Sequence, residues 1–291
     1  MSAMTFQEIV FAVLFSVVLV FNIAGNSLVI YIITNGRGMK TSTNYLLLNL
    51  AVADILCGVF LTPKFIIQPF FRHSVPDGVL GEWLCKLLLF CNIAWMASSA
   101  SIFTMVCLSV ERYFAVCRPH NFRQRFSPKI VKVLVMVSWI YAVVVASPTF
   151  VFTHFSRESF ACDMNIPGHS IFILIESVCF LILMVFLLTK ICMSLWCKQT
   201  VEPTGERDIA DNKKKKKVTW CVLAVVVTFI VCWFPSYLYY IIDGFTSRTP
   251  ILVTLLLASV NAALDPYLFS FQSSRFKVLI KKVLCCRKES S

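Results

Sequence analysis

Charged side chains are scarce in this 291-residue chain. They make up 14% of it, against about 25% in an ordinary soluble domain. Hydrophobic residues make up 58%, and the mean hydropathy is +0.78. One soluble core of this size could not bury so much apolar surface, and the composition also excludes a disordered chain, a collagen and a small disulfide scaffold. We therefore expect a membrane protein.

Patterns typical of catalysis and metal binding are missing too. The chain has only four histidines, all in or beside predicted loops, and it has no Cys-x-x-Cys pair with the spacing of a metal site. No nucleophile stands beside a base in an arrangement typical of enzymes. No internal repeat is visible, which argues against many transporters. The sequence therefore predicts neither an enzyme nor a transporter.

Long apolar runs are abundant. A bilayer core takes roughly 20 apolar residues as a helix, and seven stretches qualify. An amphipathic stretch at 273–284 follows them and is expected to lie on the membrane surface. The prediction is an all-α membrane protein, a seven-transmembrane helix bundle plus a short amphipathic cytosolic helix, with an N-terminus at 1–8, a bundle at 9–271 and a tail at 272–291. The spans are expected at about 9–33, 43–69, 84–117, 131–152, 170–195, 218–242 and 250–271.

The basic residues give the orientation. The net charge is +12, and most of the 27 Lys and Arg fall on one side of the predicted membrane, including the run Lys213–Lys217. Such an excess marks the cytosolic side, so we expect an extracellular N-terminus, a cytosolic C-terminus and a multi-pass protein of the cell membrane. Topology and anionic lipid explain the basic charge, which makes nucleic acid an unexpected partner.

Six spans each carry a short motif, in a fixed order. Each motif is weak alone, but six in register on six spans are specific. The motifs are Gly25-Asn26; Leu50-Ala51-Val52-Ala53-Asp54; Glu111-Arg112-Tyr113 downstream of Trp83-Leu84-Cys85; Trp139 followed by Pro148; Phe229 followed by Cys232-Trp233-Phe234-Pro235; and Asp265-Pro266-Tyr267-Leu268-Phe269. With these motifs, the chain resembles the rhodopsin-like (class A) G-protein-coupled receptors over essentially its whole length.

The resemblance implies a receptor that binds an extracellular ligand and activates heterotrimeric G proteins by outward motion of the sixth span. Pro235 breaks that span by removing a backbone donor, and Glu111 is expected to hold Arg112 while the receptor is off. The alternative is a mere surface ion pair, which contributes little to stability. The residues implied in coupling and switching are Glu111, Arg112, Tyr113, Trp233, Pro235, Asp265 and Pro266.

Asp54 is an ionisable group in mid-membrane, where charge is costly and usually functional. The resemblance places four more polar residues around it, and in the family such a cage of oxygen atoms holds a sodium ion. Hard cations choose oxygen ligands. The alternative is a hydrated polar network without an ion, and no other cofactor is expected. The cage residues are Asp54, Ser101, Asn261 and Asp265, with Asn26 bound through water or in an outer layer.

Two positions argue against two classes of receptor in this family. Amine receptors of the family have an aspartate where Ala94 stands, and light receptors have a lysine where Ser259 stands. The resemblance is greatest to peptide-type receptors, with a lipid or other small molecule left open. Acidic outer loops, at Asp77, Glu82, Glu158, Asp163 and Asp243, would steer a cationic peptide inward. Candidate ligand-binding positions are Lys64, Gln68, Ala94, Glu176, Trp233, Ser236, Tyr237, Tyr240 and Ser259.

Four cysteines are singled out by position. Cys85 and Cys162 are expected on the oxidising outer side and match the family's disulfide pair. Cys285 and Cys286 follow the surface helix beside basic residues, which is typical of palmitoylation, although free cytosolic thiols are the alternative.

The chain also departs from the family pattern. Phe269 and Leu188 replace two tyrosines that meet in active receptors, and Phe180 replaces a proline. Weak or partner-dependent signalling is therefore an alternative function. The interval from Cys85 to Arg112 is two residues longer than usual. We expect a bulge or an extra loop residue at the outer end of the third span.

Overall fold

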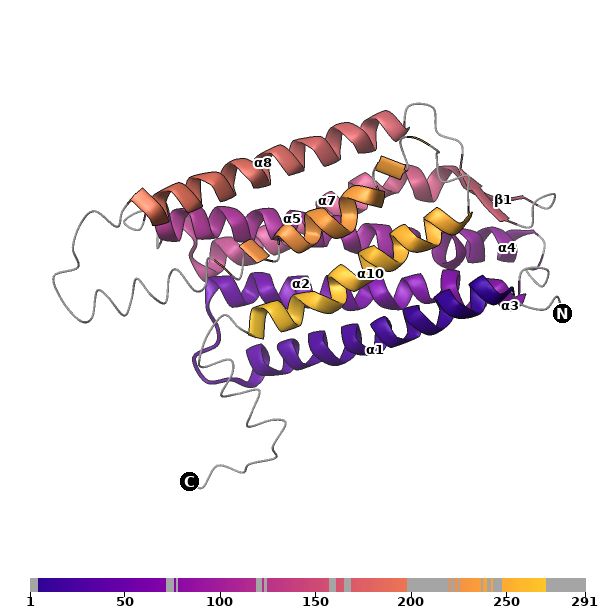
Figure 1. Ribbon diagram of the computed structural model, residues 1–291, viewed down its shortest axis with the longest axis horizontal. Coiled ribbons are helices and arrows are strands. Elements are labelled where there is room, and N and C mark those ends of the chain that lie inside the picture. Colours follow the sequence, from indigo (N-terminus) through magenta and orange to yellow (C-terminus); the bar gives the residue numbers. More distant parts are fainter. Residues whose placement is uncertain are drawn as a thin grey trace, which may run out of the picture.

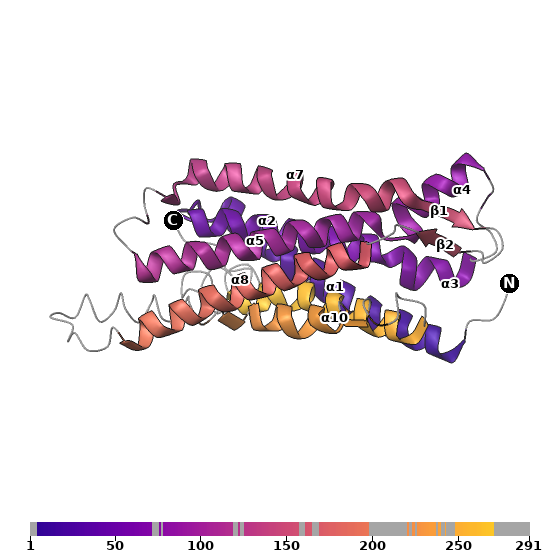
Figure 2. The same cartoon turned by 90° about the horizontal axis from the view of Figure 1, so that it is seen from above.

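The protein is a bundle of long helices that run side by side (Figures 1 and 2). Among the described residues, five helices are long and apolar enough to cross a membrane, and Val178–Ser194 and Val226–Ser236 are shorter apolar helices. The predicted seven-span bundle is confirmed. The computed structural model describes residues 5–71, 76, 78–118, 122, 125–156, 161–164, 169–197, 220, 223–224, 226–236, 238–239, 242 and 248–270.

The spans follow the chain in order. The sixth span, Val226–Ser236, has no label in Figure 1. The other spans are α1 (Phe6–Asn35), α2 (Ser42–Thr62) continued by a π-turn η1 (Pro63–Ile67) and α3 (Gln68–Phe71), α5 (Asn92–Cys117) preceded by α4 (Val79–Leu84) and a π-turn η2 (Cys85–Leu89), α7 (Pro128–Phe152), α8 (His169–Cys197) and α10 (Arg248–Ser270).

Three of these helices begin at hydroxyl residues, because a side-chain oxygen there satisfies a backbone N–H that has no partner within the helix. Thr5 forms a capping box with Glu8, in which each side chain accepts a bond from the other residue's backbone. The side chains of Thr41, at the start of α2, and Ser127, at the start of α7, each accept one bond from a backbone N–H of the first turn.

The helices pack closely where side chains are small or polar. A Cβ added at Gly25 of α1 would lie 2.6 Å from Cγ of Pro266 on α10, so this contact requires glycine. Asn26 donates a 3.0 Å bond to the backbone oxygen of Ala262 on α10. Asn49 of α2 donates to Thr104 of α5 at 2.8 Å and accepts from Trp139 of α7 at 2.8 Å. The motif residues Gly25, Asn26 and Trp139 therefore hold helices together.

The third span is interrupted near its outer end, as the long interval between Cys85 and Arg112 predicted. Residues Cys85–Leu89 form the π-turn η2, and Cys91 has a left-handed backbone with φ of 63° before α5 begins at Asn92. A π-turn takes one residue more than an α-turn. The expected bulge is confirmed: the π-helical turn and the left-handed residue interrupt the span before α5 begins.

A β-hairpin lies at the same end of the bundle as the start of α1 (Figures 1 and 2). Strands β1 (Thr153–Ser156) and β2 (Ala161–Met164) are antiparallel, with Phe155 opposite Cys162. Cys162 is disulfide-bonded to Cys85, so the predicted bridge is confirmed. The hairpin itself was not predicted and adds two short strands to an otherwise helical protein.

Several predictions concern residues outside those described. They are the surface helix at 273–284, Cys285 and Cys286, and Tyr237 and Tyr240. The boundaries of the terminal segments stay predictions as well.

Candidate functional site

A charged cluster lies near the C-terminal end of α5. The guanidinium of Arg112 forms an ion pair with the carboxylate of Glu111; the Glu111 side chain is fully buried and that of Arg112 is 12% exposed. The hydroxyl of Thr43, on α2, donates a 2.8 Å bond to Oε1 of Glu111 and also accepts one from Arg112. A buried charge is costly without partners, and here each of the three groups satisfies another. This excludes a mere surface pair.

Sequence reasoning missed Thr43. It follows Thr41 and Ser42, and hydroxyl residues at the start of a helix are commonly caps. Thr41 does cap α2, whereas Ser42 donates to the backbone oxygen of Phe126 at 2.5 Å. Only the packing of α2 against α5 shows that the third hydroxyl reaches the charged pair.

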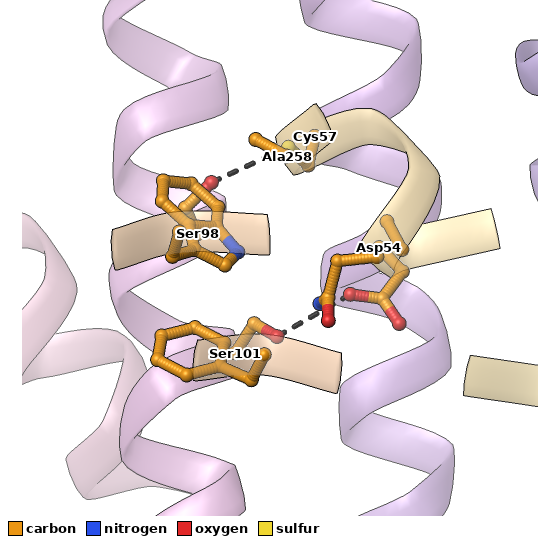
Figure 3. A pocket seen from close by; sticks show the side chains of 9 residues that line it. Asp54, Cys57, Ser98, Ser101 and Ala258 are labelled. Carbon is orange, nitrogen blue, oxygen red and sulfur yellow. Dashed lines mark hydrogen bonds between the residues drawn. The ribbon is translucent and has the colours of Figure 1, made fainter. Parts of the chain in front are cut away.

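A second polar site lies midway along the bundle, around Asp54 (Figure 3). The Ser101 hydroxyl donates to Oδ1 of Asp54 at 3.3 Å, and the Cys57 and Ser98 side chains are hydrogen-bonded at 3.3 Å. These groups line a small cavity of about 10 Å³. This volume is close to what one water molecule requires. Its lining comprises Asp54, Cys57, Ser98, Ser101, Phe229, Trp233, Ala258, Asn261 and Ala262.

This site contains an unusual number of buried oxygen atoms without partners. Oδ2 of Asp54, Oδ1 of Asn261 and both carboxylate oxygens of Asp265 have no hydrogen bond within the described part of the chain. Buried polar atoms almost always have partners, and the carboxyl groups of Asp54 and Asp265 lie close enough to interact, although Asp265 is not among the residues that line the cavity. The donor set therefore fits a hard cation. The described ranges contain no group of three His, Cys, Asp or Glu that could hold a metal ion.

Asn26 is near this site without lining the cavity. Its amide donates to the backbone oxygens of Asn22 and Ala262, consistent with its predicted outer-layer position. The same face of α1 holds a residue that sequence reasoning missed. The Asn22 amide donates a 2.9 Å bond to the backbone oxygen of Asp54, which fixes α2 at the charged residue.

Trp233 of the sixth span forms part of the cavity wall. Its ring makes an edge contact with Trp95 on α5 at 6.2 Å and stacks on Phe229 at 5.9 Å. Two residues later, Pro235 stands in the same helix. The aromatic side chain that lines this cavity thus lies two residues before a position that has no backbone N–H to donate.

The remaining ligand candidates fall into two groups. Ala94, Ser236 and Ser259 are buried; Ser236 donates to Thr254 of α10 at 3.2 Å, and Ser259 donates to Leu255 of its own helix at 2.9 Å. Lys64 and Gln68, at the outer end of the second span, are half-buried. The side chains of Ser236 and Ser259 therefore bond within the bundle, whereas those of Lys64 and Gln68 are partly exposed.

Glu176 is half-buried on α8 and has a partner that the sequence did not predict. The Tyr141 hydroxyl of α7 donates to its carboxylate. The ring of Tyr141 also lies against Phe103 at 5.4 Å and Phe180 at 6.0 Å. Phe180, which stands where the family has a proline, therefore packs at a junction of α5, α7 and α8.

Comparison with known proteins decides the family. The family described as "7 transmembrane receptor (rhodopsin family)" matches residues 25–269. The chain belongs to this family of receptors. It is a G-protein-coupled receptor and not an enzyme, as the motifs predicted.

Individual relatives cover almost all of the chain. It is 31% identical over 290 residues to Somatostatin receptor type 1 of Rattus norvegicus, covering 96% of this chain and 72% of the relative. It is 27% identical over 294 residues to Allatostatin-A receptor of Bombyx mori, covering 94% and 79%. It is 26% identical over 307 residues to Tachykinin-like peptides receptor 86C of Drosophila melanogaster, covering 96% and 59%.

The contacts of Thr43 in this receptor have a measurable consequence. We expect Thr43→Val to raise ligand-free G-protein activation by about tenfold or more, because a hydrogen bond to a charged group contributes about 1.5–3 kcal/mol. Loss of the Thr43 hydroxyl removes the bonds that tie both Glu111 and Arg112 to α2. Nucleotide exchange at matched surface expression measures the effect. Thr43→Ser keeps the hydroxyl and should behave like the unmutated receptor; equal activity of all three would show that Thr43 does not restrain the pair.

Proposed function

We propose that this receptor resides in the cell membrane with its N-terminus outside, binds a basic, neuropeptide-like peptide and activates heterotrimeric G proteins at its cytosolic face. The observation that carries the signalling part is the buried cluster of Glu111, Arg112 and Thr43 at one end of α5. Peptide binding is supported by three relatives, which are named as receptors for somatostatin, allatostatin-A and tachykinin-like peptides.

Activation is proposed to release Arg112. A ligand that displaces Trp233 would swing the cytosolic end of the sixth span about Pro235, because the helix lacks a backbone bond there. Arg112 would then leave Glu111 and Thr43 and turn toward the G protein, with Tyr113 beside it. Asp265 and Pro266 would allow α10 to change its position on α1 and α2, against which it packs.

A sodium ion is proposed at Asp54, where Ser101, Asn261 and Asp265 would supply oxygen atoms and Asn26 would support them from behind. The partnerless oxygens of this site support the proposal. A sodium ion bound there would offset one of the two negative charges that the buried carboxylates carry when both are ionised. An ion that prefers the inactive arrangement would bias the receptor toward it.

The ligand is proposed to contact Lys64, Gln68, Trp233 and Glu176, together with Tyr237 and Tyr240. Ala94, Ser236 and Ser259 would set the shape of the pocket floor, because their side chains are small and buried. A carboxylate has about four acceptor sites. The single bond from Tyr141 to Glu176 thus leaves acceptor capacity for a basic ligand group.

Replacing Glu176 with Gln tests this contact. A charge-assisted bond is worth about 1.5–3 kcal/mol, so the potency of the activating peptide should fall about tenfold or more. Tyr141→Phe is the matched control, because it removes the bond from α7 and keeps the charge, and it should leave potency nearly unchanged. A loss of thermal stability in both variants with unchanged potency would assign the pair to packing.

Screening a peptide library for G-protein dissociation in cells that express the receptor tests the proposed function. Basic peptides are expected among the hits, and neutral analogues of the same length should be weaker. Responses confined to lipids or other small molecules would contradict the peptide assignment and favour the alternative ligand class.

A second candidate function is a receptor-fold protein with weak or partner-dependent signalling. Leu188 favours it, because this side chain packs in the apolar core with Met105, Val226 and Phe229 where a tyrosine hydroxyl was expected. Robust exchange on purified G protein without a further partner would exclude it. Palmitoylation of Cys285 and Cys286 is proposed as an additional membrane attachment.

A further inference from the structure

The break in the third span stores backbone strain. Cys91 is the only residue other than glycine with a positive φ in the ranges that the structure describes, at 63°. This left-handed region brings Cβ too close to the neighbouring carbonyl oxygen, and glycine alone avoids the penalty. A non-glycine residue stays there only when its surroundings hold it.

Three segments, α4, η2 and the β1–β2 hairpin, are linked into one unit, which we call the outer cap. The disulfide between Cys85 and Cys162 joins η2 to β2. The carboxylate of Glu82, on α4, accepts a 3.3 Å bond from the backbone N–H of Phe155 on β1. These links cross all three parts of the cap, so they favour motion of the cap as a whole.

Only a few contacts join the cap to α5 across the break. The amide of Asn92 donates a 2.8 Å bond to the backbone oxygen of Lys86 in η2. Asn92 is fully buried, and its own side-chain oxygen has no hydrogen bond among the residues described. The Cys91 side chain is buried in a cluster that includes Phe15 of α1, Phe65 of η1 and Leu255 of α10.

We propose that Cys91 is a strained hinge about which the outer cap moves relative to α5, and that Asn92 is the latch that holds the cap in place. The strain favours opening, whereas three features oppose it: the Asn92 bond, the burial of Cys91, and the attachment of β1 to the end of α7, where the Thr153 hydroxyl donates to the backbone oxygen of Thr149. The hinge joins the hairpin to the helix that carries Ser101 and Arg112. A ligand that touches the hairpin would therefore act on a two-state joint within the helix that signals. The proposal does not depend on the ligand's identity.

Hydrogen–deuterium exchange of the purified, ligand-free, full-length receptor in lipid nanodiscs tests the hinge, read at the amides of residues 85–92. Cys91→Gly and Cys91→Ala both remove the thiol, but only glycine removes the left-handed penalty. We expect these amides to exchange at least about threefold more slowly in the glycine variant than in the alanine variant. Cys91→Val should exchange faster than the unmutated receptor, because β-branched residues are the least tolerant of positive φ.

The latch is tested with Asn92→Leu, which has a similar volume and removes the donor to the backbone oxygen of Lys86. Exchange at 85–92 should speed up about threefold or more, with the amides of residues 100–108 inside α5 unchanged as the internal control. Equal exchange in the glycine and alanine variants, or faster exchange in glycine, would overturn the hinge. Exchange at 85–92 that Asn92→Leu does not alter would overturn the latch.

Discussion

Sodium chloride should raise the Tm of the purified, ligand-free receptor by about 5 °C over N-methylglucamine chloride of equal ionic strength, and Asp54→Asn should abolish the difference. An ion at about 100 times its Kd adds roughly 2.7 kcal/mol to stability, and each kcal/mol shifts Tm by about 2–4 °C in a chain of this size. The substitution keeps the shape of the side chain and removes one of two buried carboxylates, so the cation loses its main attraction.

Glu176→Gln is the matched control for this experiment. It removes another carboxylate within the membrane, but Glu176 is bonded to Tyr141 and is not among the residues that line the cavity. Its sodium effect should equal that of the unmutated receptor. Asp265→Asn should give a reduced effect. Equal Tm in the two salts for the unmutated receptor would show that the site around Asp54 holds water alone.

The second large effect is expected from the disulfide. The bridge between Cys85 and Cys162 closes a loop with a sequence separation of 77 residues. Chain entropy for a loop of that length corresponds to about 4–5 kcal/mol, although membrane insertion already restrains the unfolded chain. Cys162→Ser should therefore remove most of the correctly folded receptor from the cell surface, measured by antibody binding to an extracellular tag.

Two comparisons separate the bridge from a general effect of losing a cysteine. Cys179→Ser alters a free and exposed cysteine on α8 and should leave surface expression unchanged. Cys85→Ser combined with Cys162→Ser should be no worse than either single change, because both break the same bond. A double variant with twice the loss of stability would contradict this account.

The fold was predictable because the lengths of the hydrophobic segments and the order of the motifs can be read directly from the sequence. Asp54, Ser101 and Asn261, which were predicted to lie together, line one cavity, and Glu111 and Arg112 form the expected pair. That Trp233 lines the same cavity was not predicted. The extra length before Arg112 also predicted an irregularity, since two added residues cannot be accommodated in a continuous helix without displacing the disulfide or the inner half of α5.

What sequence reasoning missed depends on contacts between distant elements. From the sequence alone Thr43 resembles a helix cap, and only the packing of α2 against α5 shows its bond to Glu111. The bond from Asn22 to the backbone oxygen of Asp54 likewise depends on the packing of α1 against α2. The partner of Glu176 is 35 residues away on another helix. Strands of four residues, such as β1 and β2, carry too few alternating positions to indicate a hairpin.

Exchange of bound GDP for a GTP analogue on purified heterotrimeric G proteins tests the central claim most directly. Receptor in nanodiscs, given a peptide hit from the screen, should accelerate uptake well above its ligand-free rate. Arg112→Ala should abolish the acceleration while still binding the same peptide, because the arginine acts at the cytosolic end. A folded receptor that binds the peptide but accelerates exchange on no heterotrimer, or an Arg112→Ala variant that signals normally, would contradict the account.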